Sequence, residues 1–232
     1  MKSLHINDIK FSVHLYSEQI LRLLPSKIPL NVSLPLIAET ILQASLSSIE
    51  NIVGTKTELL LFVHGNTDKS TLRKELKSIE IDRSGLTNHF VLPICFNKGT
   101  DWNSIEDLSG VAKATFIDQI LKSNLSLAMY GFLPGFMYLD GLAETLQILR
   151  KTKPVKKVNP GSFAIGGPYA GIYNIESPGG WHVIGHCPLQ LFNAASILSP
   201  FVNIGDTFTL KQISIAEWKS LNAETVNIKD YN

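Results

Sequence analysis

The chain has 232 residues, of which 44% are hydrophobic and 18% are charged, and its formal net charge is +1. This composition is typical of a compact globular protein with one large or two small domains, and it excludes an intrinsically disordered chain. The nearly neutral charge gives no reason to expect a nucleic-acid partner, and no apolar run reaches the roughly 18 residues of a membrane span.

The cysteines and the first residues bear on the compartment. Cys95 and Cys187 are too few for a disulfide framework, and their apolar flanks predict buried thiols. The opening stretch MKSLHINDIKFSV is interrupted by polar residues, which is not the pattern of a signal peptide. We therefore expect a cytoplasmic protein that binds neither membranes nor nucleic acids.

Helix and strand patterns alternate closely in the first third of the chain. Residues 33–44 predict a helix with Ser33 as N-cap and Pro35 in its first turn, and residues 70–79 predict a second helix. Four stretches predict strands, the last two joined by a hairpin around Gly54: 9–16, 19–24, 48–53 and 57–64. The spacing leaves no room for long crossovers, so we expect a small α+β sandwich, ferredoxin-like, in residues 1–85.

A polar, turn-rich stretch at 82–88, DRSGLTN, predicts the boundary to a second domain of residues 86–232. Residues 89–96 then predict a strand, and residues 103–123 predict one or two helices. The rest of the chain shows short strand patterns broken by turns, and 11 of the 16 glycines lie between positions 131 and 205. Short strands at this spacing predict an antiparallel β-barrel or sandwich.

A single formally charged residue, Glu176, lies between Val158 and Gly205. A carboxylate in such apolar surroundings needs a partner. Two alternatives stay open. Glu176 caps the turn that follows it or points into solvent, or it shares a pocket with His182, six residues later, as an acid–base pair.

The stretch GGWHVIGHCP places His182 and His186 four residues apart. On a helix this spacing would favour a metal pair, but the glycines and the proline predict a strand, in which the two positions are roughly 13 Å apart. No carboxylate or thiolate stands at the spacing of a third ligand, so we expect no metal site. The favoured interpretation of each imidazole is a hydrogen-bonded core or pocket histidine.

The run RKTKPVKK, residues 150–157, holds five cations in eight residues. Such a run is usually a solvated loop, but this one directly precedes the glycine-rich, nearly uncharged strands. It could therefore border a cavity that binds a carboxylate or phosphate. The glycines that follow lack both the Gly-Lys-Ser/Thr ending of a P-loop and the spacing of a dinucleotide fingerprint, so they predict no phosphate cradle.

Apolar side chains crowd around the Pro134–Gly135 turn in YGFLPGFMYLDGL, residues 130–142. One alternative is a core plug whose turn requires the glycine. The other is an apolar wall of a ligand pocket or partner interface. The two alternatives can coexist.

These stretches together resemble a known family. GFLPGFMYLDGL, PGSFAIGG, GIY, SPGGWHVIG and PLQLF follow in this order and at tight spacing. They are similar to the family of the B subunit of bacterial ATP-dependent 5-oxoprolinase, a carboxyltransferase domain family. It includes the kinase-A inhibitor of sporulation, allophanate hydrolase subunit 1-like proteins and a region of urea amidolyase. The match is specific over residues 131–192 and looser over the rest.

The resemblance implies a two-domain α+β architecture, with a small α/β N-terminal domain and a cyclophilin-like C-terminal β-barrel. It also implies a non-autonomous subunit of a cyclic amide hydrolase. Homologues of the A and C subunits are the implied partners, and together the three chains open the lactam of 5-oxoproline to glutamate at the expense of ATP. We expect ATP to be bound mainly with those partners.

The chain departs from the family pattern at three places, one of which is a histidine before the GF motif, where this chain has Lys122 and Ser123 nearby. Members usually have Pro-Arg pairs where this chain has LRKTKPVKKVNPG, and Gly-Arg-Thr-Pro where it has Gly-His-Cys-Pro at 185–188. Arginine binds carboxylate or phosphate through a planar fork, which lysine and neutral histidine do not reproduce. Anion binding would then depend on Lys156 and Lys157.

We expect the site to lie in the cleft of the barrel, with a small acidic substrate. His182 is the expected proton donor or hydrogen-bond partner, and Glu176 is the group expected to orient it. The glycine pair before Trp181 allows close approach of the backbone to substrate. The residues expected to bind substrate are Phe136, Lys156, Lys157, Gly179, Gly180, Trp181 and His186.

Two other functions stay open. One is a regulatory module that docks on a sensor histidine kinase and inhibits it, and the other is an allophanate hydrolase or urea amidolyase-type subunit. A regulator needs a wide apolar patch rather than an acid–base pair, and the departures from the family arginines favour it. Neighbouring genes for the A and C subunits would favour the enzyme, whereas a neighbouring kinase gene would favour the regulator.

Overall fold

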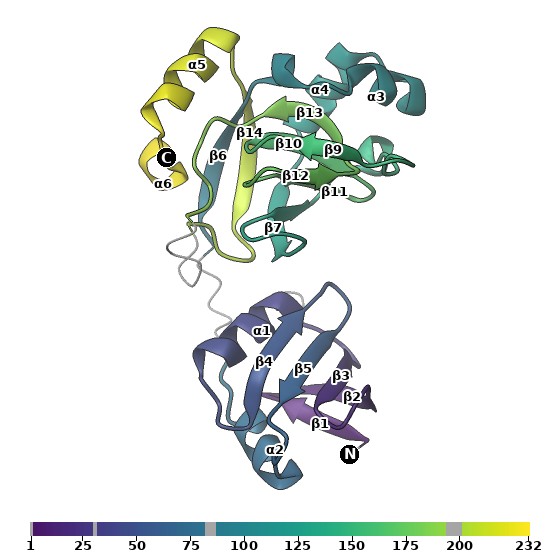
Figure 1. Cartoon of the computed structure of the whole chain (residues 1–232), viewed down its shortest axis with the longest axis vertical. Helices are drawn as coiled ribbons and strands as arrows, with labels where there is room; N and C mark the ends of the chain where they lie inside the picture. Colours follow the sequence, from purple (N-terminus) through teal and green to yellow (C-terminus); the bar gives the residue numbers. More distant parts are fainter. Residues whose placement is uncertain (1, 30–31, 82–86, 194–200) are drawn as a thin grey trace. The chain divides into compact units, whose positions relative to one another are not determined.

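The computed structural model describes residues 2–29, 32–81, 87–193 and 201–232. Internal contacts divide the chain into two compact units, Met1–Leu86 and Thr87–Asn232, and each has a hydrophobic core of its own. Most of the expected boundary stretch, residues 82–86, lies outside the described residues. Figure 1 labels most of the helices and strands of each unit.

The first unit is a five-stranded antiparallel sheet with two helices, and its strand order is β1-β2-β3-β5-β4 (Figure 1). Its elements are β1 (Ser3–Ile6), β2 (Ile9–Leu15), β3 (Ile20–Pro25), α1 (Leu34–Gln43), β4 (Ile49–Gly54), β5 (Leu59–Val63) and α2 (Lys69–Lys77). Three strands, a helix, two strands and a helix thus follow one another, whereas a ferredoxin-like fold is built as β-α-β-β-α-β.

Local sequence explains the elements of this unit. The Ser33 side chain accepts a hydrogen bond from the Leu36 N–H at 3.2 Å, which caps α1 where the sequence predicts it. The hairpin at Gly54 is confirmed, since this residue pairs with Leu59 in the β4–β5 ladder. Helix α1 packs on β4, and α2 packs on β1. The predicted mixed α+β class is therefore confirmed for this unit.

The second unit is built on a strongly curled seven-stranded sheet of order β13-β10-β11-β8-β7-β14-β6, in which β14 and β6 are parallel. A separate ribbon pairs β12 with β9 (Figure 1). The strands are β6 (His89–Ile94), β7 (Leu125–Tyr130), β8 (Met137–Asp140), β9 (Val155–Val158), β10 (Ser162–Gly166), β11 (Tyr169–Ile172), β12 (Ser177–Gly179), β13 (His182–His186) and β14 (Thr207–Gln212). The helices are η1 (Phe96–Lys98), α3 (Trp102–Ser109), α4 (Lys113–Leu121), η2 (Glu144–Leu146), α5 (Ile215–Glu224) and α6 (Ile228–Tyr231).

The two outer edges of the curled sheet meet at Cys95 and His186. The Cys95 N–H donates to the carbonyl of His186 at 2.9 Å, and the His186 N–H donates back to Cys95 at 3.2 Å. The curled sheet and the helices α3 and α4 enclose the main core, in which Phe116 and Phe163 are fully buried. The sequence therefore correctly predicts a barrel-like second domain, in the form of a curled half-barrel.

Both cysteines, Cys95 and Cys187, are free and buried, as their flanking residues predict. None of the helices that the structure describes is long and apolar enough to span a membrane.

Candidate functional site

An aromatic cluster lies on the face of the curled sheet opposite the main core. Side chains alternate between the two faces of a strand, so Phe163 and Ile165 of β10 enter the main core while Ala164 joins the second cluster. On β13, Ile184 enters the main core and Val183 joins the second cluster. The members of this aromatic cluster are Phe136, Val158, Ala164, Tyr173, Trp181 and Val183, with Leu133, Tyr138 and Tyr169 packed against them.

The rings of the cluster meet edge to face. The ring centre of Phe136 lies 4.9 Å from that of Tyr173 and 5.3 Å from that of Trp181. Tyr138 approaches Trp181 at 5.4 Å. This T-shaped arrangement is the one that aromatic quadrupoles favour, so the rings fix one another in place.

Two glycines make room for the Trp181 ring on the sheet. A Cβ at Gly166 would lie 2.5 Å from ring carbons of Trp181, and a Cβ at Gly171 would lie 2.9 Å from another. Any side chain at either position would therefore displace the indole. The glycines of β10 and β11 set the floor on which Trp181 rests.

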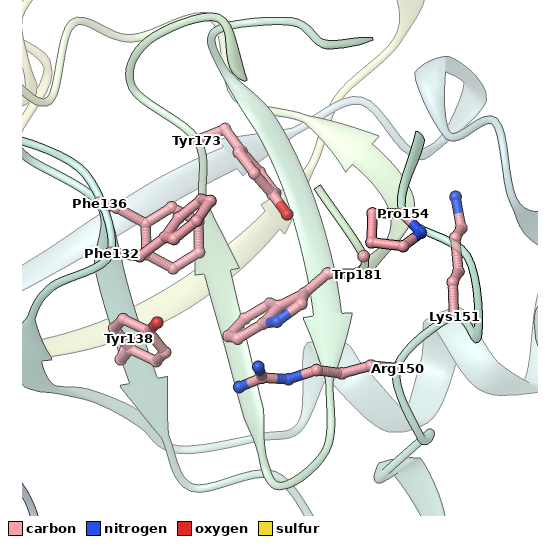
Figure 2. Close-up of a pocket in the computed structure, with 9 residues that line it drawn as sticks. Phe132, Phe136, Tyr138, Arg150, Lys151, Pro154, Tyr173 and Trp181 are labelled. Atoms are coloured by element: carbon pink, nitrogen blue, oxygen red, sulfur yellow. The ribbon is translucent and has the colours of Figure 1, made fainter. Parts of the chain in front are cut away.

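Beside these rings lies a cavity of about 170 Å³ (Figure 2). Its lining residues are Phe132, Phe136, Tyr138, Arg150, Lys151, Pro154, Tyr173, Gly180 and Trp181. A cavity of roughly 150 Å³ is enough to hold benzene. This aromatic pocket therefore has the size for one small ring.

Two cations line the aromatic pocket, and of these Lys151 pairs with Asp101 while Arg150 contacts Trp181. Its guanidinium carbon lies 5.6 Å from the ring centre of Trp181, and its side chain runs along the indole (Figure 2). A guanidinium so placed gains a cation–π attraction and keeps its planar fork of donors. None of the ion pairs among the described residues involves Arg150. The fork is therefore free to bind an anionic group that enters the pocket.

Three of the residues expected to bind substrate, Phe136, Gly180 and Trp181, line this pocket together. Gly179 is not among the residues that line it, and a Cβ at this position would lie 2.5 Å from the Tyr173 hydroxyl. A Cβ at Gly180 would meet its nearest atom, in Pro154, only at 3.8 Å. Close backbone approach is thus open at Gly180.

His182, the residue after Trp181, does not line the pocket and has 3% of its surface exposed. Its Nε2 lies 3.0 Å from the carbonyl oxygen of Leu149, and since a carbonyl only accepts, Nε2 carries the hydrogen. Its Nδ1 is buried and has no hydrogen-bond partner among the described atoms. Burial lowers the pKa of His182 below 6.5. The imidazole is therefore neutral at pH 7.

The structure does not pair Glu176 with His182. Glu176 forms an ion pair with Lys157 at 2.5 Å, and both side chains are more than half exposed. Lys156, which precedes Lys157 on β9, is also exposed. Neither lysine lines the aromatic pocket. The catalytic and anion-binding roles expected for these residues stay predictions.

His186 lines a different cavity, of about 350 Å³, together with Cys187 and Asn174. Its Nε2 donates to the Pro160 carbonyl at 2.8 Å, and its Nδ1 accepts from Trp218 Nε1 at 2.9 Å. Burial lowers its pKa too. Its substrate-binding role stays a prediction. Among the residues that the structure describes, no group of three or more His, Cys, Asp or Glu side chains is placed to hold a metal ion.

The sequence patterns missed part of the pocket. Arg150 stands in the cation run, but nothing in that run separates it from the solvated lysines. Tyr138 and Tyr173 could have been found from strand alternation, which places them on the face opposite Leu139 and Ile172.

Residues 18–201 match the model of the carboxyltransferase domain family, subdomain C and D. The chain belongs to this family. The matched stretch contains every residue that lines the aromatic pocket.

Two curated relatives are named as the B subunit of 5-oxoprolinase. The one from Bacillus subtilis is 29% identical over 136 residues, which is 58% of this chain and 57% of the relative. The one from Haemophilus influenzae is 29% identical over 171 residues, which is 72% of this chain and 80% of the relative. The chain is thus similar to the 5-oxoprolinase B subunit and spans little more than half the length of the Bacillus protein.

The crystal structure of the Kluyveromyces lactis urea carboxylase resembles this chain with a TM-score of 0.64. The match covers 98% of this chain and 25% of the urea carboxylase at 13% identity. At that identity the likeness shows the fold alone.

Proposed function

We propose that this protein is the B component of an ATP-dependent 5-oxoprolinase-type complex, and that its aromatic pocket binds the small acidic lactam. In this proposal the ring of 5-oxoproline lies among the aromatic side chains. Its carboxylate pairs with the Arg150 guanidinium. The free guanidinium over Trp181 is the observation that carries the proposal.

The chemistry of the pocket suits this ligand. 5-Oxoproline is a flat five-membered ring with a carboxylate, and the pocket combines an aromatic wall with one cation of the kind that binds carboxylates through two parallel hydrogen bonds. The relatives named as the 5-oxoprolinase B subunit support the same substrate class.

ATP and the partner chains belong to the same proposal. Amide resonance makes a lactam resistant to opening, so coupling to ATP is chemically sensible. The pocket holds one guanidinium and one paired lysine, which is little for a triphosphate. We therefore assign ATP mainly to homologues of the A and C subunits. The role of this chain is to hold the lactam in the assembled complex.

The reconstituted complex tests this function. The chain, co-expressed with homologues of the A and C subunits, is expected to release glutamate from 5-oxoproline only when ATP is present. Arg150→Gln is expected to raise KM for 5-oxoproline by about 10- to 100-fold, since a hydrogen bond to a charged group contributes about 1.5–3 kcal/mol.

Lys153→Gln is the matched control, because it removes an exposed cation from the same run outside the pocket lining. It is expected to leave KM unchanged. A complex that forms but releases no glutamate with ATP contradicts the function. Turnover with an unchanged KM in Arg150→Gln contradicts the role of the guanidinium.

A further inference from the structure

We infer that Asp101 and Lys151 are positioning residues that hold the Arg150 guanidinium over Trp181. This inference rests on the proposed function in one respect only, namely that Arg150 meets an acidic ligand. The positioning itself is a property of the free chain.

Arg150 has little to hold its own side chain. The residue is exposed, and its guanidinium contacts the Trp181 ring without an acidic partner among the described residues. A free arginine side chain has many accessible rotamers, and holding it in one of them costs entropy. Its orientation therefore depends on how firmly the backbone beneath it is fixed.

That backbone is tied down on both sides. Before Arg150, the Ile148 carbonyl accepts from the Gly167 N–H at 2.7 Å, and the Leu149 carbonyl accepts from His182. After it, the Lys151 N–H donates to the Gly180 carbonyl at 2.8 Å. The segment that carries the guanidinium is thus hydrogen-bonded to β13 and to the residues that directly follow β10 and β12.

The Lys151 side chain adds an ion pair with Asp101. Its Nζ lies 2.8 Å from Asp101 Oδ2, and both side chains are only about 15% exposed. The same Oδ2 accepts the Val183 N–H at 2.6 Å, and the Asp101 N–H donates to the Val183 carbonyl at 3.0 Å. Asp101 is therefore held at β13 by two hydrogen bonds. Its ion pair with Lys151 in turn holds the segment that carries Arg150 against β13. A partly buried pair is also less screened by salt than a surface pair.

The two neighbouring cations therefore have different tasks. In Figure 2 the Arg150 side chain runs along the indole of Trp181, while the Lys151 ammonium points away from the aromatic rings. Lys151 forms an ion pair with Asp101, which leaves Arg150 as the cation that faces the ligand. Loss of the Lys151–Asp101 pair is expected to loosen the backbone at Arg150 and to spread its guanidinium over several rotamers.

The first arm of the test uses the ligand-free full chain and nuclear magnetic resonance. Protons held over the face of an indole are shifted by its ring current, so the Arg150 side-chain signals, assigned by their loss in Arg150→Gln, report its position. We expect shifted signals in the native chain and in Lys151→Arg. We expect signals near the values of a free arginine in Asp101→Asn and in Lys151→Met, which leaves the Asp101–Val183 bond in place.

Asp118→Asn is the matched control, since it removes an exposed carboxylate on α4 that pairs with Lys122, the residue just after the helix. It is expected to leave the Arg150 signals unchanged. Unshifted Arg150 signals in the native chain would overturn the inference. Shifted signals that persist in both Asp101→Asn and Lys151→Met would overturn it as well.

The second arm measures turnover in the complex with the partner chains. Asp101→Asn and Lys151→Met are expected to raise KM for 5-oxoproline by about tenfold with kcat changed less than about twofold, and Lys151→Arg is expected to restore KM. A loss of kcat alone would contradict positioning. Absence of turnover in the native complex would contradict the proposed function. The nuclear magnetic resonance measurement on the ligand-free chain would still decide whether Asp101 and Lys151 position Arg150.

Discussion

The Nε2 atom of His182 lies 3.0 Å from the carbonyl oxygen of Leu149, so the imidazole donates its hydrogen to the backbone directly before Arg150. The other nitrogen, Nδ1, is buried without a hydrogen-bond partner among the described atoms. A proton added there would be a buried, unpartnered cation, which is costly. This geometry favours His182 as a support of the Arg150 segment over His182 as a proton donor.

Replacement of His182 separates these two roles. His182→Ala is expected to raise KM for 5-oxoproline by about tenfold and to lower the free energy of unfolding by about 1–3 kcal/mol, because the Leu149 carbonyl loses its donor. His182→Gln, whose amide can donate, is expected to recover part of both. Steady-state kinetics and urea denaturation measure the two effects. A large loss of kcat at unchanged stability and KM would instead make His182 a proton donor.

Gly166 offers a test of the pocket floor. Gly166→Ala places a methyl group 2.5 Å from the Trp181 ring, so we expect the indole to shift and 5-oxoproline binding to weaken by at least about tenfold. Gly131→Ala is the control, because its added Cβ would meet Tyr138 at an ordinary 3.5 Å. Near-ultraviolet circular dichroism measures the change in the environment of the Trp181 ring, and calorimetry measures the affinity for 5-oxoproline. Unchanged spectra and affinity in Gly166→Ala would show that Trp181 does not rest on the sheet as described.

Periodicity and capping predicted most of the first unit, and short strand patterns broken by turns predicted a barrel or sandwich in the second, although not the parallel pairing of β14 with β6. The apolar stripe of α1 and the Ser33 cap are local signals, and so is the Gly54 hairpin. Helix α5 has no apolar stripe, because none of its side chains is buried, and its one local signal is the capping box of Ser214 and Glu217. It is held at the sheet through the hydrogen bond from Trp218 to His186, a contact that spans 32 residues.

The site was harder to predict, because its parts come from distant stretches. The sequence pointed to Phe136, Gly180 and Trp181, whose residue types are unusual for their local patterns. It could not choose Arg150 from five neighbouring cations, since the choice is made by Asp101, about 50 residues upstream, which pairs with Lys151. Such pairing is set by tertiary contacts rather than by spacing along the chain.

Buried His182 and partly buried His186 predict a loss of stability in mild acid. Burial lowers the pKa values of His182 and His186 in the folded chain, whereas both titrate near about 6.5 when unfolded. Between those values the unfolded chain binds more protons, so the free energy of unfolding falls as the pH falls. The stabilisation is complete above about pH 6.5 and is lost progressively as the pH drops through the folded pKa values.

Urea denaturation at about pH 7.5 and about pH 5 measures this loss. The double variant His182→Gln/His186→Gln is expected to lose less stability between the two pH values than the native chain. An equal loss in both proteins would assign the acid sensitivity to carboxylates instead.

The thiols are expected to be inert in the folded chain. Burial raises the pKa of Cys187 to about 12, and Cys95 is also buried. Only the thiolate reacts readily with iodoacetamide, so the native chain should stay unlabelled near pH 8 while the urea-unfolded chain gains two labels. Intact-mass spectrometry counts them. Rapid labelling of the native chain would show that at least one thiol is open to solvent.

The most direct test compares two ligands on two proteins by calorimetry, using the assembled complex. 5-Oxoproline and 2-pyrrolidinone share the lactam ring, but only the first has a carboxylate. The native complex is expected to bind 5-oxoproline at least about tenfold more tightly, and the Arg150→Gln complex is expected to bind the two with nearly equal affinity. A preference for 5-oxoproline that survives in Arg150→Gln, or no preference in the native complex, would contradict the assignment of the aromatic pocket and its guanidinium to an acidic lactam.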